Sequence, residues 1–125
     1  MGVRGYGESR EQAFEQAGLA LTAVITDLAT VHPELSVPIQ CSAPDDEILF
    51  AEWLNALVFE MATRRMLFSS FRVIVTGTTL EGLAWGEHVE PTRHHPAVEV
   101  KGATYTALKV APVDDGWMAQ TVVDV

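Results

Sequence analysis

ILFAEWLNALVFEM (residues 48–61) is apolar around almost its whole circumference and decides the fold. A helix with so little polar surface belongs in the interior of a domain. We therefore predict that this segment is the central core helix. The acidic run at residues 45–47 favours the positive end of the helix dipole, and either Ser42 or Asp45 can cap the helix.

For the chain before this helix we predict a strand, a helix and a second strand. Residues 1–7 are glycine-rich and compatible with one brief strand. Ser9 and Gln12 match the capping-box pattern, and apolar residues then recur at helical spacing. Residues 35–41 alternate between apolar and polar, as in a half-buried strand. Pro38 cannot donate to a ladder, so we expect this strand at an edge or with that position pointing outward.

The chain after the helix reads as β-structure. We predict strands at residues 71–77, at about 79–89 and, after a polar loop, at 98–110. A hairpin turn at residues 114–116 then leads into the last strand, which ends the chain. Strand–helix–strand followed by helix–strand–strand predicts an α+β fold, with two helices packed on one mostly antiparallel mixed sheet.

Length and composition indicate one soluble domain, residues 1–125. The formal net charge is −9, and the eight Lys and Arg residues are scattered, which argues against direct binding of nucleic acid. The single Cys41 excludes an internal disulfide and fits a reducing compartment. Apolar runs stay below the roughly 18 residues of a membrane span, and the start lacks a signal-peptide core. We expect a cytoplasmic protein that does not bind membranes.

Most residues with reactive side chains have an ordinary structural explanation. His94 and His95 are adjacent, so in an extended segment they point apart, and we interpret them as part of a solvated loop. Cys41 is interpreted as a small buried side chain, and the Asp114–Asp115 pair as turn chemistry. Phosphate-loop, zinc-protease and serine-hydrolase motifs are absent from the sequence, and nothing in it makes a convincing enzyme.

Two positions near the end of the chain stay open between a functional and a structural explanation. The Asp124 side chain and the main-chain carboxylate of Val125 fall on adjacent residues, which makes a half-built site for a hard cation or simply the end of a strand. Lys101 lies on the polar face of the strand at residues 98–110, where a lysine is normally just solvated. Asp124 is expected opposite about Ala107, which would leave Lys101 on the order of 20 Å from it.

Four segments, read together, resemble the archease family. They are SREQAFEQAGLALTAVITD (residues 9–27), AEWLNALVFE (51–60), RHHPAVEVKGATYTALKV (93–110) and GWMAQTVVDV (116–125). They follow the family's order and cover nearly the whole chain. The resemblance implies a fold in which one strand–helix–strand–strand module is inserted into another.

The resemblance also implies a function in tRNA splicing and RNA repair. Archease is a protein cofactor, not an enzyme, and promotes guanylylation of the RtcB-type RNA ligase, which uses GTP. The family's divalent cation site, for calcium or magnesium, would use Asp124 and the terminal carboxylate of Val125. An essential lysine in a glutamate-valine-lysine block falls on Lys101.

The sequence departs from the family at two places. Family members begin with a segment ending His-Thr-Ala-Asp, and Met1 stands where the residue after that aspartate should be. Either translation starts upstream of Met1 or this is a divergent or truncated member. We expect the first, with an in-frame extension that ends in an aspartate, the third metal ligand. Thr106 stands where many members carry histidine.

Two other functions remain as alternatives. One is a small metal-dependent hydrolase in which His94, His95 or Asp114 joins Asp124. The other is a chaperone-like module that binds partners without a metal.

Overall fold

The computed structural model describes all of residues 1–125, and it confirms an α+β fold. The strands are β1 (Gly2–Gly7), β2 (Leu35–Ser42), β3 (Met66–Thr76), β4 (Thr79–His88), β5 (Gly102–Ala103), β6 (Lys109–Val113) and β7 (Gly116–Asp124). The helices are α1 (Arg10–Ile25), a 3-10 turn η1 (Leu28–Thr30), α2 (Asp46–Arg64) and the one-turn α3 (Pro91–His94).

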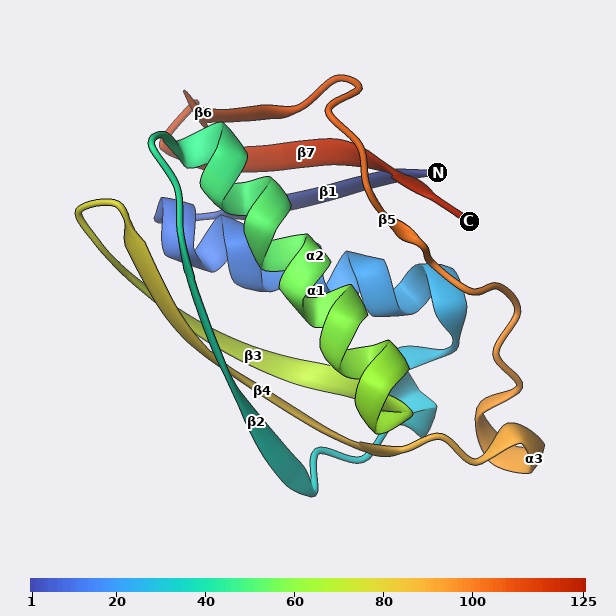
Figure 1. The fold of residues 1–125 in the computed structure, drawn as a ribbon. Coiled ribbons are helices and arrows are strands. Elements are labelled where there is room, and N and C mark those ends of the chain that lie inside the picture. The colour runs from blue at the N-terminus through green and yellow to red at the C-terminus, as the bar shows by residue number, and fades with distance from the viewer.

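The strands form two antiparallel sheets, not the single mixed sheet that we expected. In sheet A, β7 pairs with β1 on one side and with β5 and β6 on the other; in sheet B the order is β2-β4-β3. Each sheet satisfies its hydrogen bonds within one module: β2-α2-β3-β4 is inserted between β1-α1 and β6-β7. This nesting confirms the module-in-module arrangement. Figure 1 shows α1 and α2 in the space between the two sheets, and both helices contact both sheets.

The helix caps follow from the sequence. The Ser9 hydroxyl accepts a hydrogen bond from the Gln12 N–H at 3.1 Å, and the Gln12 side chain accepts one from the Glu8 N–H at 2.6 Å. Asp45, and not Ser42, caps α2 by accepting from the Ile48 N–H at 2.8 Å. The two signals therefore fix where α1 and α2 begin.

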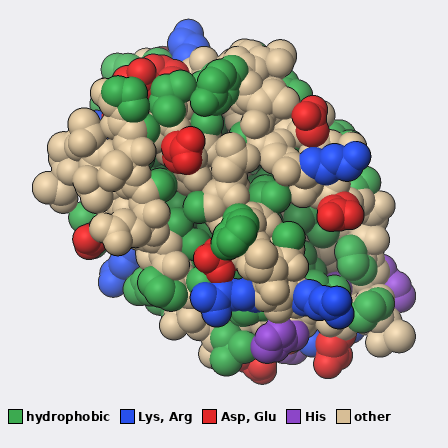
Figure 2. Space-filling model, viewed as in Figure 1, with side chains coloured by type: hydrophobic (Ala, Val, Ile, Leu, Met, Phe, Trp, Pro, Cys, Tyr) green, Lys and Arg blue, Asp and Glu red, His purple; other side chains and the backbone are tan.

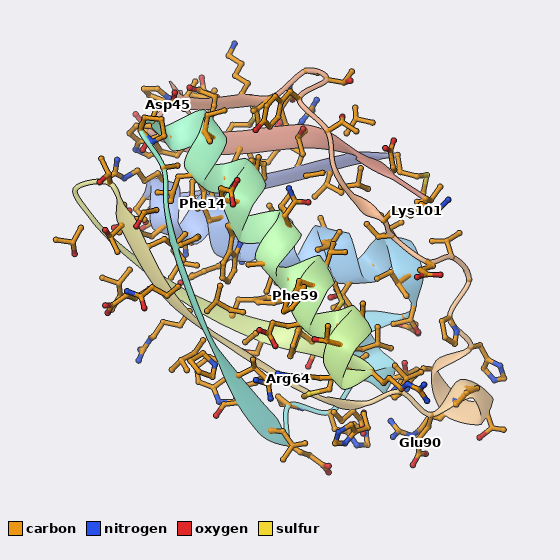
Figure 3. All side chains as sticks on the ribbon, viewed as in Figure 1. Phe14, Asp45, Phe59, Arg64, Glu90 and Lys101 are labelled. Atoms are coloured by element: carbon orange, nitrogen blue, oxygen red, sulfur yellow. The ribbon has the colours of Figure 1, made fainter.

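Helix α2 supplies the centre of the core, as predicted. Trp53 is fully buried, and its indole N–H donates to the Phe14 carbonyl at 3.0 Å, which joins the two helices. Its ring occupies the space above Gly82 of β4, where a Cβ would approach the ring within 2.8 Å. One face of α2 stays open, however, and Phe59 on that face is 62% exposed (Figure 3).

Strand β2 lies at the edge of sheet B, and Pro38 is exposed there, as its missing N–H requires. The strand predicted at residues 98–110 is instead two short strands, β5 and β6, separated by residues 104–108. None of the helices combines the length and apolar character needed to cross a bilayer.

Candidate functional site

The end of β7 brings Lys101 and Asp124 together, against our expectation of a large separation. Gly102 pairs with Asp124, and the Lys101 N–H donates to the Asp124 carbonyl at 2.8 Å. We call Lys101, Asp124 and Val125 the C-terminal edge. The three residues lie side by side at one end of sheet A, and the expected distance of about 20 Å is wrong.

An excursion of the chain at residues 104–108 causes this difference. Ala103 pairs with Val123 and Lys109 with Gln120, so five residues on one strand oppose only two on β7. Thr104 holds the start of the excursion, because its N–H and its hydroxyl both donate to the Val122 carbonyl at 2.8 Å. The excursion takes up the extra length: the chain leaves β7 opposite Val123 and returns opposite Gln120, so that Lys101 stays beside Asp124.

Side-chain hydrogen bonds fix this geometry from both sides. The Thr121 hydroxyl donates to the Thr104 carbonyl at 2.6 Å, and Ala107 takes a left-handed φ of 54° to close the turn. Asn55 of α2 accepts from the Ala103 N–H at 2.8 Å and so attaches β5 to the core helix. Sequence reasoning missed Asn55, although an amide in a largely apolar helix was a signal that it binds a backbone group.

The C-terminal edge is open to solvent and its charges are unpaired. Lys101, Asp124 and Val125 are all exposed, and neither the Lys101 ammonium nor the Asp124 carboxylate has a hydrogen bond or an ion pair. Lys101, just before β5, is exposed, as predicted, while Val100 beside it is buried (Figure 3). The end of β7 therefore presents one ammonium group and two carboxylates to solvent. These groups are available to a ligand or a partner.

A second charged group joins α3 to the end of β4, and the sequence did not predict it. We call Glu87, Arg93 and His94 the Glu87 cluster. Arg93 binds both oxygens of the Glu87 carboxylate, at 2.7 and 2.8 Å, and also donates to the Thr30 carbonyl at 2.6 Å. The expected solvated loop is wrong for His94, whose side chain is fully buried, and correct for His95, which is exposed.

Hydrogen bonds set the state of each member of the Glu87 cluster. The Arg93 guanidinium holds the pKa of Glu87 far below its usual range, helped by donors from His32 and His94 and opposed by burial. His94 Nδ1 accepts from the Glu90 N–H at 2.8 Å, so Nε2 carries the proton and donates to Glu87 at 3.1 Å. The donors and acceptors of the cluster are thus occupied within the fold.

The remaining predicted candidates do not join the C-terminal edge. Asp114 lies in the β6–β7 turn with φ of 47°, at the other end of β7 and on the order of 25 Å from Asp124. That turn consists of Asp114 and Asp115, because Val113 pairs with Gly116; we had predicted it over residues 114–116. Burial raises the pKa of the Cys41 thiol to about 11, with Glu52 adding to the effect. No group of three or more His, Cys, Asp or Glu residues is arranged to hold a metal ion.

The fold and the C-terminal edge define a class: a small α+β protein made of one β-α-β-β module inserted into another. Comparison with known proteins gives the family. The model of the Archease protein family (MTH1598/TM1083) matches residues 1–125, so the chain belongs to the archease family.

Individual relatives agree with this assignment. The chain is 35% identical to Protein archease of Pyrococcus furiosus, covering all of this chain and 92% of that protein. It is 34% identical to Protein archease of Sulfurisphaera tokodaii, covering all of this chain and 91% of the relative.

Two solved structures share the fold. Protein 1598 of Methanobacterium thermoautotrophicum superimposes with a TM-score of 0.86 at 29% identity, over 99% of this chain and 91% of that one. An archease from Thermotoga maritima, described as a possible chaperone, gives a TM-score of 0.67 at 18% identity, over 100% of this chain and 90% of that one.

Proposed function

We propose that this chain activates an RtcB-type RNA ligase in tRNA splicing and RNA repair. In this proposal the C-terminal edge docks at the ligase and promotes its guanylylation, a reaction in which the ligase consumes GTP. The archease chain carries out no bond-making step itself. The proposal places it in the cytoplasm, where its single Cys41 stays reduced.

The observation that carries the proposal is the contact between Lys101 and Asp124. The Lys101 N–H donates to the Asp124 carbonyl, so the lysine and both carboxylates start from neighbouring backbone positions. An ammonium group binds phosphate oxygens, and carboxylates bind a hard cation. A nucleotide-binding ligase presents both kinds of charge, the negative phosphates and the positive metal ion. One exposed strand end thus offers the chemistry for both.

The donor atoms at the C-terminal edge are of the type that binds calcium or magnesium. Both ions prefer carboxylate oxygens, and Asp124 and Val125 supply them without competing hydrogen bonds. Two such groups are fewer than these ions usually take from protein and water. The ion would supply positive charge at the tip of the edge, where Asp124 and Val125 would hold it.

The pairing of β1 with β7 supports a third ligand. Gly2 pairs with Val122, and the Val123 N–H donates to the Met1 carbonyl at 2.8 Å. A residue that precedes Met1 and continues this register would lie opposite Asp124. The resemblance implies an aspartate at that position, so its carboxylate would complete the set with Asp124 and Val125.

The charge of the chain also supports a protein partner. With a net charge of −9, the surface suits a basic, RNA-binding ligase and does not compete with it for RNA. On the face shown in Figure 2, basic side chains lie beside acidic ones and form no continuous basic surface for a phosphate backbone.

The test measures ligase guanylylation with labelled GTP in the presence of wild-type chain, Lys101→Ala or Lys109→Ala, each carrying the expected upstream aspartate. Lys109 is the matched control, because it is also exposed and without an ion pair but lies on β6. We expect Lys101→Ala to fall to the rate without activator and Lys109→Ala to remain near wild type. No stimulation by wild type would overturn the proposed function. Full stimulation by Lys101→Ala would overturn the role of the lysine alone.

A chelator distinguishes the chaperone-like alternative. If the chain binds and stimulates the ligase equally with and without EDTA, the chaperone-like function is the better description and the cation is dispensable. The hydrolase alternative has no support from geometry. His94 is buried, Asp114 lies at the far end of β7, and no three His, Cys, Asp or Glu residues, His95 included, are grouped to hold a metal.

A further inference from the structure

The outer face of sheet B is hollow and uncovered. The helices lie against its inner face, and no element packs on the outer one (Figure 1). A depression of about 500 Å³ crosses all three strands. We call it the outer groove; the residues that line it include Pro38, Gln40, Arg72, Ile74, Glu81 and Leu83. Ile74, near the end of β3, is 57% exposed there, although isoleucine is usually among the most buried residues.

Two opposite charges in the outer groove are unpaired although they are neighbours. Ile74 pairs with Glu81 and Leu83 pairs with Arg72, so Arg72 and Glu81 are diagonal on adjacent strands. Diagonal positions lie about 7 to 8 Å apart, within reach of long side chains. Neither side chain forms an ion pair or a hydrogen bond within the chain. Both charges are therefore free for another molecule, and together they leave the groove neutral on a chain of net charge −9.

The edges of sheet B are less suited to a partner than its face. Pro38 interrupts the row of donors along β2. On β3, the Glu15 carboxylate accepts from the Val73 N–H at 2.8 Å and so occupies a donor that an added strand would use. Strand addition at either edge is thus hindered, which directs association to the face.

We propose that the outer groove binds a second copy of this chain in a symmetric dimer. A two-fold axis makes the same patch meet itself, so a patch with one cation and one anion is complementary to its own copy. Arg72 of each copy would meet Glu81 of the other, and Ile74 and Leu83 would be buried between them. A basic ligase would gain nothing from a neutral groove, whereas a second acidic chain meets no local repulsion there.

The size and geometry of the face limit the dimer. Three strands about 4.8 Å apart, paired over about eight residues, present on the order of 400 Å² per copy. That area is below the usual size of a stable interface, so the dimer is weak and concentration-dependent. The line from Arg72 to Glu81 runs obliquely across the strands, and the two-fold axis must be perpendicular to this line. The strands of one sheet therefore cross those of the other at a steep angle, closer to orthogonal than to aligned packing.

Sedimentation equilibrium of the full chain, from about 10 μM to about 1 mM because the interface is small, tests the proposal. Wild type should dimerise within this range. Arg72→Glu and Glu81→Arg each place like charges together at both contacts, and each should weaken association at least about tenfold. An equimolar mixture of the two variants should associate again as a heterodimer, because every contact then joins opposite charges.

Lys109→Glu and Glu52→Arg are the controls, since they make the same charge changes on other exposed surfaces. They should associate like wild type, and circular dichroism should show that all variants are folded. A wild-type chain that stays monomeric throughout the range overturns the dimer. Single variants that associate like the controls, or a mixture that stays monomeric, overturn the Arg72–Glu81 contact and leave no basis for a dimer through this face. Ligase stimulation does not enter the measurement, so the result is independent of the proposed function.

Discussion

The Glu87 cluster and the C-terminal edge are both charged, but only one of them is available for binding. In the Glu87 cluster, Arg93 and His94 bind a carboxylate that is almost fully buried. At the C-terminal edge, Lys101 and Asp124 are exposed and their charged groups have no partner. Buried charges must be paired within the fold, whereas solvated charges need not be. The cluster therefore stabilises the fold, whereas the edge is left exposed for the role that we propose for it.

The largest predicted effect comes from breaking the Glu87 cluster. Glu87→Gln keeps the shape but removes the negative charge that faces Arg93 and His94. Breaking a buried ion pair usually costs 3–5 kcal/mol, and we expect about 3 because Arg93 is partly exposed. Urea unfolding at pH 7 measures the loss. Glu90→Gln is the control: its carboxylate lies 3.6 Å from the same arginine but is exposed, so the change should stay within about 0.5 kcal/mol. Equal losses in both variants would show that burial is not what distinguishes Glu87.

A second prediction concerns acid. The folded-state pKa of Glu87 is far below that of the unfolded chain, so its contribution is complete above the unfolded value and is lost as pH falls. The unfolded chain takes up the proton first, at about pH 4.3, and the contribution then falls by up to about 1.4 kcal/mol per pH unit. The difference in stability between wild type and Glu87→Gln should therefore be constant from pH 7 to 5 and shrink below pH 4. Urea titrations at several pH values measure it. A constant difference down to pH 3 would contradict the lowered pKa.

The same contrast explains what the sequence predicted and what it did not. Local signals sufficed for α1, where Ser9 and Gln12 form the cap, and for β2, where Pro38 requires an edge. The burial of His94 depends on Glu87, which lies seven residues earlier on β4 and meets it only in the folded chain. No local pattern reports such a pairing.

The position of Lys101 shows the same limit. Residues 98–110 alternate like one strand, but Thr104 binds Val122 and Ala107 turns left-handed without a glycine to mark the turn. The excursion follows from tertiary hydrogen bonds and not from turn residues. As a result Lys101 lies next to Asp124, although counting along one continuous strand placed the two residues far apart.

A third prediction concerns cations, whose effect on stability is smaller. Asp124 and Val125 supply too few oxygens for tight binding, so we expect weak binding of calcium or magnesium by the chain of residues 1–125. Adding an upstream segment that ends in aspartate should tighten it, and Asp124→Asn should abolish it. Isothermal titration calorimetry measures the affinity, and a ligand at its dissociation constant should stabilise the fold by only about 0.4 kcal/mol. Equally tight binding with and without the segment would contradict the three-carboxylate site.

A comparably small effect on stability is predicted for Lys101→Ala, which tests directly whether the C-terminal edge acts on a partner or holds the fold. The side chain is exposed and makes no hydrogen bond, and only its backbone N–H holds Asp124. Because alanine keeps that N–H, the free energy of unfolding should change by no more than about 0.5 kcal/mol, as is usual at surface sites. Urea unfolding of Lys101→Ala beside Lys109→Ala measures this. A stable chain that has lost ligase stimulation would place Lys101 among the residues that act on a partner. A large loss of stability would instead show that the C-terminal edge, like the Glu87 cluster, holds the fold together.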